Sequence, residues 1–451
     1  MFSKIKYDLR EKIISSTKEG NAEISGTIDA LQTSLDSLTQ SINTLKKDVA
    51  KMASEINQLK NEADFSGTEF VSNEYLPLSH DSKKKRLLVC GFYGAKNLGD
   101  ELMLQSLLSR LDKTKYDITI MVARHKENDM SCYSPFKVIH YPQKNDDILN
   151  IVHNYDLLVW GGGAILDDSE YGFNGAKTPL GYIFMKSSIA MICAKKPVYV
   201  LGVSTNQHFK DATFIDDLSF VVKHATYFSL RDTNSKNTLK EAGIDISKVS
   251  IIDDLTISAI PVKVVERKKS SSELHIGIIL INSWDNVDKF ASFLKNLASA
   301  APDKKIVIHF IPFYDYIDLD INGYKKIADL AGINHVIEKN SKNIDELADE
   351  LLSCEIIFSM RYHGSLIASL LNIKTISIDI SKGHPHYYNK VNYIKECYND
   401  TLTSISFEDL TKPGKVKDVL DEVQGLKKTS DSKKIISSAS KKLDDLINKL
   451  F

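Results

Sequence analysis

From Arg86 onward the chain repeats one pattern: a short apolar run, a glycine-rich or polar joint, and a segment with helical periodicity. The runs of the first series lie at 86–90, 118–122, 138–141, 156–160, 198–202 and 226–230. Short apolar runs that alternate with helices predict buried parallel strands, because a parallel connection needs a crossover that is usually a helix. This part of the chain therefore predicts an α/β fold with doubly wound sheets.

A polar stretch at 261–273 divides the pattern into two series, and such a shift in composition marks a domain boundary. The runs of the second series lie at 274–280, 305–311, 356–360 and 374–378. A chain of 451 residues is also long for a single core. We therefore expect two Rossmann-like domains, at 86–262 and 274–427, and a C-terminal helix at 428–451 that packs on them.

Residues 24–59 carry an unbroken heptad repeat with mostly β-branched residues at one core position and mostly leucine at the other. This pattern favours a parallel two-stranded coiled coil, with a trimer as the alternative. We predict an N-terminal helix and coiled coil at 1–62, a linker at 63–85, and a homodimer through residues 24–59. The segment bears on assembly and not on chemistry.

The composition limits the classes of partner. The 58 Lys and Arg against 59 Asp and Glu give a net charge of -1, which argues against broad binding to nucleic acid. No stretch approaches the roughly 20 apolar residues of a membrane span, so we expect at most peripheral membrane contact, at the inner face. The cysteines form no C-x-x-C pair, and Cys90, Cys193 and Cys354 lie in apolar runs. Buried free thiols and a cytoplasmic location are predicted.

Arg361 and His363 stand where an apolar run at 356–358 passes into a helix. The carboxyl ends of parallel strands face the ligand crevice, and a helix N-terminus favours anions. Arg361 offers a fork of N–H donors for a carboxylate or phosphate, and His363 can exchange a proton near neutral pH. Taken alone, a structural ion pair for Arg361 and a helix cap for His363 explain the same residues.

Arg231 has the same placement, after the run at 226–230 and before a helix. Two such arginines could each take one charged group of a dianionic ligand. Asp100 and Glu101 stand at the N-terminal end of a helix that we expect at 102–111. Carboxylates at this place suit contacts with sugar hydroxyls or general-base catalysis better than phosphate binding. For Asp100, a simple N-cap is the alternative.

Three glycines at 161–163 follow another apolar run. Glycine lets backbone N–H groups approach a ligand closely, so Gly162 and Gly163 are candidates for a second anion or sugar loop. Close packing of a strand on a helix would explain these glycines equally well. No cluster of residues indicates a metal or a bound cofactor.

In their order along the chain, four of these motifs resemble the polysaccharide pyruvyl transferase family. The motifs are Asn97-x-Gly99-Asp100-Glu101, Gly161-Gly162-Gly163, Arg231-Asp232-x-x-Ser235 and Arg361-x-His363-Gly364, and the resemblance covers about residues 86–380. It implies a glycosyltransferase-B-like (GT-B-like) pair of Rossmann domains. It also implies transfer of the enolpyruvyl carbons of phosphoenolpyruvate to a sugar, with formation of a pyruvate ketal and release of phosphate.

The resemblance also implies roles for individual residues. Arg231 and Arg361 would bind the carboxylate and phosphate of phosphoenolpyruvate, and His363 would handle protons. Ketal formation also needs a base for each attacking hydroxyl, and Asp100 or Glu101 is our candidate for it. The full set of expected substrate-binding residues is Asn97, Gly162, Gly163, Arg231, Arg361, Tyr362 and Gly364. Where related proteins often have Asp-Pro, this chain has Asp253-Asp254-Leu255, which leaves the role of Asp253 open.

The acceptor implied by the resemblance is a saccharide of a surface polysaccharide or its precursor, either free or lipid-linked. Two rival functions stay open at this point. One is a nucleotide-sugar glycosyltransferase of the same architecture, in which the arginines hold a diphosphate. The other is an inactive scaffold whose function is the coiled coil.

Overall fold

The computed structural model describes residues 83–123, 130–142, 145–168, 180–205, 208–261, 272–281, 286–300, 302–314, 319–338, 341–380, 394, 401–412, 414–426 and 431–451. The predicted N-terminal helix, the coiled coil with its dimer, and the linker up to residue 82 lie outside the described residues.

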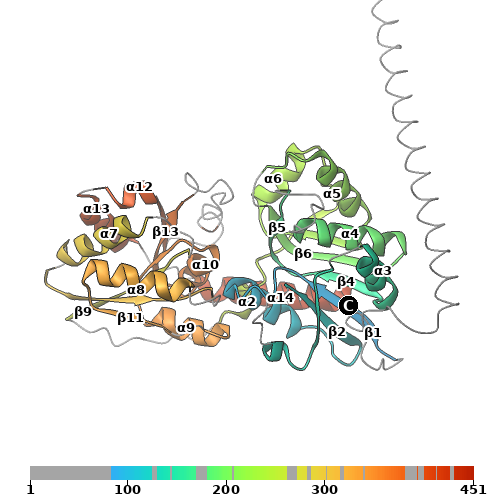
Figure 1. The fold of residues 1–451 in the computed structure, drawn as a ribbon, viewed down its shortest axis with the longest axis horizontal. Helices are drawn as coiled ribbons and strands as arrows, with labels where there is room; N and C mark the ends of the chain where they lie inside the picture. The colour runs from blue at the N-terminus through green and yellow to red at the C-terminus, as the bar shows by residue number, and fades with distance from the viewer. Residues whose placement is uncertain are drawn as a thin grey trace, which may run out of the picture. The chain divides into compact units, whose positions relative to one another are not determined.

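The first domain contains an eight-stranded parallel sheet in the order β3-β2-β1-β4-β6-β7-β8, with β5 paired to β6 (Figure 1). Its elements are β1 (Lys85–Cys90), α2 (Leu98–Leu108), β2 (Tyr116–Val122), the 3-10 helix η2 (Met130–Tyr133), β3 (Lys137–His140), α3 (Asn145–Asn154), β4 (Leu157–Trp160), β5 (Gly163–Leu166), α4 (Leu180–Cys193), β6 (Val198–Thr205), α5 (Ala212–His224), β7 (Tyr227–Leu230), α6 (Thr233–Glu241), β8 (Val249–Ile251) and the 3-10 helix η3 (Ile257–Ala259).

The second domain contains a six-stranded parallel sheet in the order β11-β10-β9-β12-β13-β14. Its elements are β9 (Glu273–Ile279), α7 (Val287–Ala300), β10 (Lys305–Phe310), α8 (Leu319–Ala331), β11 (His335–Ile337), α9 (Ile344–Leu352), β12 (Ile356–Ser359), α10 (Tyr362–Leu370), β13 (Lys374–Asp379), β14 (Leu402–Ser406), α12 (Phe407–Leu410) and α13 (Lys415–Gly425), and α14 (Ser432–Leu450) ends the chain. Two Rossmann-like α/β domains were predicted, and the two parallel sheets confirm this.

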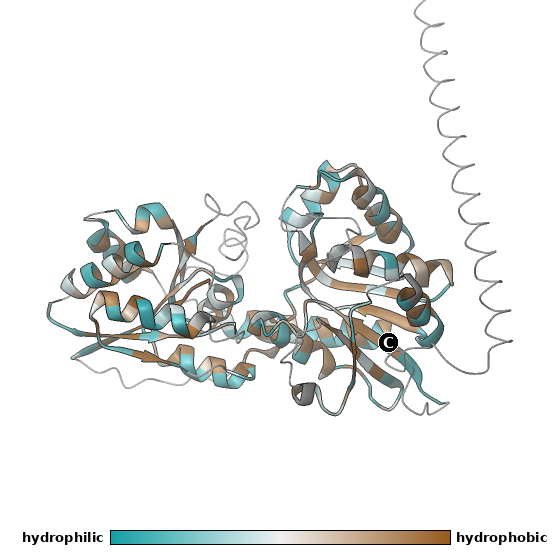
Figure 2. Cartoon of the chain, viewed as in Figure 1, coloured by the Kyte–Doolittle hydropathy of each residue, from teal (hydrophilic) through white to brown (hydrophobic). Residues whose placement is uncertain are grey.

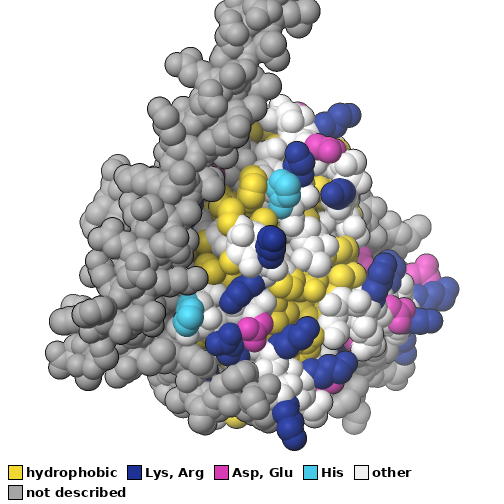
Figure 3. All heavy atoms as spheres, turned by 90° about the vertical axis from the view of Figure 1, so that its right-hand side faces the viewer, with side chains coloured by type: hydrophobic (Ala, Val, Ile, Leu, Met, Phe, Trp, Pro, Cys, Tyr) yellow, Lys and Arg dark blue, Asp and Glu magenta, His cyan; other side chains and the backbone are white. Residues whose placement is uncertain are grey.

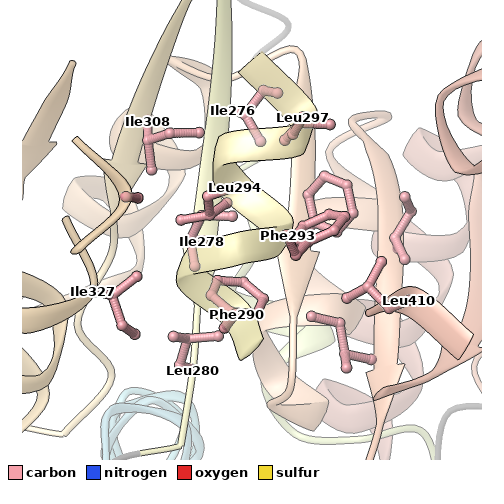
Figure 4. Packing of buried hydrophobic residues seen from close by; sticks show 14 of the residues in the cluster. Ile276, Ile278, Leu280, Phe290, Phe293, Leu294, Leu297, Ile308, Ile327 and Leu410 are labelled. Atoms are coloured by element: carbon pink, nitrogen blue, oxygen red, sulfur yellow. The ribbon is translucent and has the colours of Figure 1, made fainter. Parts of the chain in front are cut away.

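The strands are apolar along their length because helices cover both faces of each sheet. Every residue of β4, β6 and β12 is buried, and Figure 2 shows the sheet interiors as the most hydrophobic parts of the fold. Continuous apolar strands of this kind are typical of doubly covered parallel sheets. In the second domain, Phe290, Phe293 and Leu294 of α7 pack on Ile278 and Leu280 (Figure 4).

The C-terminal helix α14 joins the two cores. Ile436 and Ala439 belong to the core cluster on one face of the second sheet, which also takes in Leu98 and Leu102 of α2. Farther along the same helix, Leu443 and Ile447 belong to a cluster of the first sheet. Arg110 Nε donates to Asp444 Oδ1 at 2.7 Å, so a polar contact also ties α14 to the first domain.

The amino edge of the first sheet is rich in exposed lysines, and Figure 3 shows many more basic than acidic side chains on that side. Exposed lysines in the segments that lead into β1, β2, β6, β7 and β8 are Lys83, Lys85, Lys113, Lys115, Lys195, Lys223 and Lys248. Lys223 stands in the last turn of α5, where it favourably meets the negative end of the helix dipole. The opposite, carboxyl edge holds buried charges.

Three local predictions need correction. Helix α2 begins at Leu98, four residues before the expected start, because Asn97 and not Asp100 is its N-cap. Cys193 is exposed although its neighbours in sequence are apolar, since it is the last residue of α4; Cys90 and Cys354 are buried thiols as expected. Short strands β5, β8, β11 and β14 were not predicted. Within the described part of the chain, none of the helices is both long and apolar enough to cross a membrane.

Candidate active site

Arg231 stands at the end of β7, where its guanidinium is buried, with only 3% of the residue exposed. Nη1 donates to Asp254 Oδ2 at 2.8 Å, and Nε lies 4.0 Å from Asp232 Oδ2. Its Cζ atom lies 4.2 Å from the ring centroid of Tyr362, which adds a cation–π contact. A buried cation is stable only with such partners, so Arg231 is part of a compact charged cluster.

Asp254 lies after β8, the strand next to β7, and is 2% exposed. Oδ1 accepts the backbone N–H of Thr256 at 2.9 Å and the Thr256 hydroxyl at 2.7 Å. Burial alone would raise the pKa of Asp254, but His363, Arg231 and Thr256 together hold it well below its ordinary value. The carboxylate is therefore ionised and fixed in orientation.

His363 reaches this cluster from the first turn of α10, in the second domain. Its Nε2 lies 3.5 Å from Asp254 Oδ2, which is a charge contact and not a hydrogen bond by geometry, and the side chain is 12% exposed. The opposite side of the ring lies on Gly99 in α2, where a Cβ atom would stand only 2.0 Å from Nδ1. Only glycine at position 99 leaves room for the imidazole.

Arg361 precedes the same helix, at its N-cap position. Ser359 Oγ accepts the backbone N–H of Arg361 at 3.1 Å, and Arg361 Nε donates to the carbonyl of Leu280 at 2.9 Å. The guanidinium carbon lies 5.4 Å from the ring centroid of Tyr314, and Tyr314 forms an isolated β-bridge with Asn97. These contacts hold Arg361 against the second domain through a neutral acceptor and a ring.

The start of α2 carries the remaining polar residues of the site. The Asn97 side chain caps the helix by accepting the backbone N–H of Gly99 at 3.3 Å. Asp100 is buried in the first turn, and a Cβ atom on Gly163 would stand 3.1 Å from its Oδ1. Gly163 has φ +123°, a conformation that side chains rarely adopt, so the glycine loop and Asp100 lie against one another.

Glu101 is oriented differently from Asp100. Its Oε1 accepts the backbone N–H of Gly94 and the hydroxyl of Tyr133, both at 2.9 Å. Burial raises the pKa of Glu101, and these two hydrogen bonds oppose the rise. Both contacts lie inside the first domain, which favours a structural role for Glu101.

The predicted residues thus divide into two groups. Those brought together around α2 and α10 are Asn97, Asp100, Gly163, Arg231, Arg361, Tyr362 and His363. Gly162 and Gly364 serve close packing, since a Cβ atom would stand 2.7 Å from Met103 Sδ at the first and 2.6 Å from Ser359 Oγ at the second. Glu101 makes its hydrogen bonds elsewhere. In the described residues no group of His, Cys, Asp and Glu could hold a metal ion.

Two residues of the site were not foreseen. The sequence does not distinguish Asp254 from Asp253; in the structure Asp253 pairs with Lys442 at 3.2 Å, whereas Asp254 contacts Arg231 and His363. The sequence signal for Asp254 is the pair of acids that follows a short apolar run, and this run forms β8 in the structure. Tyr314, an aromatic residue just beyond β10, had no comparable signal.

Several solved structures are similar to this chain in fold. UDP-GlcNAc 2-epimerase from Neisseria meningitidis, bound to UDP-GlcNAc, is 13% identical with a TM-score of 0.46, covering 80% of this chain and 100% of its own. Sucrose-phosphate synthase from Thermosynechococcus elongatus is 9% identical with a TM-score of 0.49, covering 82% and 99%. The calicheamicin glycosyltransferase CalG4 is 10% identical with a TM-score of 0.47, covering 82% and 98%.

No curated protein matches the chain. A family model does: the one described as polysaccharide pyruvyl transferase matches residues 97–382, which is more than half of the 451 residues. The matched segment begins at the Asn97 cap of α2 and includes Arg231, Asp254, Arg361 and His363. The chain belongs to the polysaccharide pyruvyl transferase family.

Proposed function

We propose that this protein uses phosphoenolpyruvate as donor and forms a pyruvate ketal on a saccharide, with release of phosphate. The observation that carries the proposal is the position of His363, held between Gly99 of α2 and the Asp254–Arg231 pair. A group able to exchange a proton near neutral pH therefore lies at the carboxyl ends of both sheets, close to two arginines and one buried acid.

The reaction asks for three kinds of group. Two hydroxyls of the acceptor form bonds to the central carbon of phosphoenolpyruvate, and the bond from that carbon to the phosphate oxygen breaks. Of the two hydroxyl protons released, one is balanced by the proton gained at the methylene carbon, which becomes a methyl group, and the other leaves with phosphate. A proton donor, a base for the hydroxyls and positive charge for the anionic donor are needed.

His363 is the proposed proton donor to the methylene carbon. Asp100 is the proposed base, because it lies buried beside Gly163 in the turn that contacts His363, whereas Glu101 binds Gly94 and Tyr133. Between the two acids that the sequence left as candidates, this geometry favours Asp100.

Arg361 is the proposed contact for a charged group of the donor. It stands at the N-terminus of α10, whose first N–H groups lack intrahelical acceptors and favour an anion. Arg231 has its guanidinium 3% exposed between two carboxylates and a ring, which supports a different task, that of holding Asp254 and Tyr362 in place.

The test is incubation of candidate capsule or exopolysaccharide repeat units with phosphoenolpyruvate, followed by mass spectrometry and a phosphate assay. We expect a pyruvyl mass increment and one phosphate per ketal, both abolished by His363→Gln. Release of nucleoside diphosphate from an activated sugar would instead support the glycosyltransferase. Absence of turnover on the whole panel, with assembly intact, would support the scaffold.

The partners follow from the same proposal. The acceptor is a saccharide of a surface polysaccharide or its precursor, and comparing free with lipid-linked repeat units in the assay separates the two forms. We also propose that residues 24–59 make a homodimer and that the protein acts in the cytoplasm. Sedimentation equilibrium of the full chain, with Leu38→Asp as the disrupting variant, measures the dimer.

A further inference from the structure

The carboxylate of Asp254 contacts the proposed proton donor from the other domain, and this contact has a chemical consequence. We propose that Asp254 is a positioning residue that holds His363 with a proton on Nε2, so that Nδ1 is the nitrogen that exchanges a proton with substrate. The inference deepens the proposed function and rests on it for the identity of the substrate. It concerns which nitrogen acts and what keeps it in place.

The first step is that Asp254 cannot turn away from His363. Thr256 occupies Oδ1 with two hydrogen bonds, and Arg231 donates to Oδ2 at 2.8 Å. Oδ2 also faces His363 Nε2 at 3.5 Å. Three hydrogen bonds hold the Asp254 carboxylate in a fixed orientation. The nitrogen of the imidazole that its negative charge faces is Nε2.

The second step concerns the other groups around the ring. On α10 itself, the Tyr362 ring centroid lies 5.1 Å from that of His363 and stacks on the Arg231 guanidinium. On α2, Gly99 contacts Nδ1 and Asp100 follows in the same turn. Among the described residues in these contacts, Arg231 carries positive charge, and it is bound directly to Asp254.

The third step follows from the two forms of imidazole. A neutral histidine carries one proton, and an adjacent carboxylate stabilises the form with that proton on the facing nitrogen. Because the negative charge of Asp254 stands 3.5 Å from Nε2, the form with the proton on Nε2 is stabilised, so Nδ1 carries the lone pair in neutral His363 and the transferable proton in the cation. This is the logic by which an aspartate orients the histidine of a hydrolase triad, with the two ring nitrogens exchanged.

The position of Nδ1 agrees with that assignment. It lies at Gly99, in the turn of α2 that also carries Asp100, the proposed base. A proton leaving Nδ1 and a proton arriving at Asp100 would therefore be exchanged with substrate at the same helix start. Asp254 lies on the far side of the ring and touches no substrate in this arrangement.

The experiment compares Asp254→Asn with Asp253→Asn, which removes the neighbouring carboxylate that pairs with Lys442. In full-length protein labelled with 13C in the histidine rings, the His363 signal is assigned from its loss in His363→Gln and followed as a function of pH without substrate. We expect the titration midpoint of His363 to fall by about one unit or more in Asp254→Asn, since an opposite charge nearby favours the protonated ring. Asp253→Asn should leave it unchanged.

Kinetics supply the second readout. In Asp254→Asn we expect kcat for pyruvyl transfer to fall about 100-fold or more, with a change in KM for phosphoenolpyruvate of less than about threefold. The alkaline limb of the kcat profile should move to lower pH. Asp253→Asn should keep the wild-type profile.

Thr256→Val covers the case in which Asp254→Asn does not fold. This variant keeps the Asp254 carboxylate and removes the Thr256 hydroxyl, one of the three hydrogen-bond donors to it. We therefore expect a smaller shift of the His363 titration midpoint in the same direction. An unchanged midpoint in folded Asp254→Asn, or in Thr256→Val when that is the only variant to fold, would overturn the inference. If the wild type fails to transfer pyruvate, the proposed function falls, and the ring titration still decides the role of Asp254.

Discussion

Arg231 and Arg361 occupy matching places in the chain, each just after a buried strand and just before a helix, yet their side chains end in different surroundings. Arg231 is 3% exposed and lies between Asp254, Asp232 and the Tyr362 ring. Arg361 is half-buried, donates Nε to the Leu280 carbonyl and lies over the Tyr314 ring.

The difference comes from the neighbouring strands. The strand beside β7 is β8, and Asp254 follows it, so a carboxylate meets Arg231 as soon as the two strands pair. Strand β12 lies between β9 and β13, and Arg361 meets the carbonyl of Leu280, the residue that follows β9. A guanidinium matched by a carboxylate can be fully buried, as Arg231 is, whereas Arg361 donates Nε to a neutral carbonyl and is only half-buried.

The largest effect should come from Arg231→Met. Removing the cation leaves Asp254 buried without the guanidinium that pairs with it at 2.8 Å, so we expect a loss of about 3–5 kcal/mol in unfolding free energy. Urea unfolding followed by circular dichroism measures it. Arg361→Met is the matched variant and should lose much less, and equal losses would break the comparison.

Gly99→Ala should be next. The added methyl group would stand 2.0 Å from His363 Nδ1, so the ring must move. Because a displacement of about 1 Å can lower a rate about 100-fold, we expect a fall of at least that size in kcat. Gly323→Ala in α8, where the added atom meets nothing within 4 Å, is the control and should keep full activity. A fully active Gly99→Ala would remove His363 from the site.

Arg361→Ala should act on donor binding. A hydrogen bond to a charged group contributes about 1.5–3 kcal/mol, so KM for phosphoenolpyruvate should rise about tenfold to a hundredfold with little change in the thermal midpoint. Steady-state kinetics at varied donor concentration measure it. Arg86→Ala, which removes the pair with Asp156 at the amino edge of the first sheet, should leave this KM unchanged. An unaltered KM for phosphoenolpyruvate in Arg361→Ala would contradict the assignment of Arg361 to donor binding.

The smallest expected effect compares two acids. Asp254 has Arg231 and His363 beside it, whereas Glu350 has other carboxylates nearby. Beside Arg231 and His363 the pKa of Asp254 is lowered, so its stabilising contribution is present above its ordinary pKa and is lost as the pH falls. Burial, with Glu338 and Glu346 nearby, raises the pKa of Glu350 to about 7 from 4.5. Glu350 therefore favours the folded state at low pH, and this contribution is lost as the pH rises through that range.

Glu350→Gln should accordingly raise the thermal midpoint relative to wild type above about pH 7 and change it little below about pH 5. Thermal unfolding at a series of pH values measures the difference. Asp345→Asn, which removes an exposed acid of α9 that does not contribute to the raised pKa of Glu350, is the control. A constant difference between wild type and Glu350→Gln at every pH would contradict the assignment.

The fold was predictable because its signals are local. The runs at 198–202, 226–230 and 356–360 became β6, β7 and β12, since a strand covered on both faces must be apolar throughout. Strands β5, β8, β11 and β14 were missed because they are short or lie at sheet edges, where fewer residues are buried. The observed start of α2 at Leu98 differs from the predicted one because the Asn97 side chain caps the helix, a role that its place in a candidate binding motif does not reveal.

The site was predictable only in part. Arg231, Arg361 and His363 stand at joints between strands and helices, and such joints can be recognised along the chain. Asp254 could not be chosen over Asp253, because adjacent residues of an extended segment point to opposite sides and nothing local says which side faces Arg231. Only the pairing of β7 with β8 and the approach of α10 select it.

By itself, the sequence determined the two parallel sheets, the joints that carry charge, and the family to which the chain belongs. The tertiary structure decided how those charges are used: Arg231 pairs with Asp254, Arg361 stays beside a carbonyl, and Glu101 binds inside its own domain. The physical reason is that apolar periodicity is a property of neighbouring residues. The environment of a charge depends on groups that lie far apart in the chain, as His363 and Asp254 do.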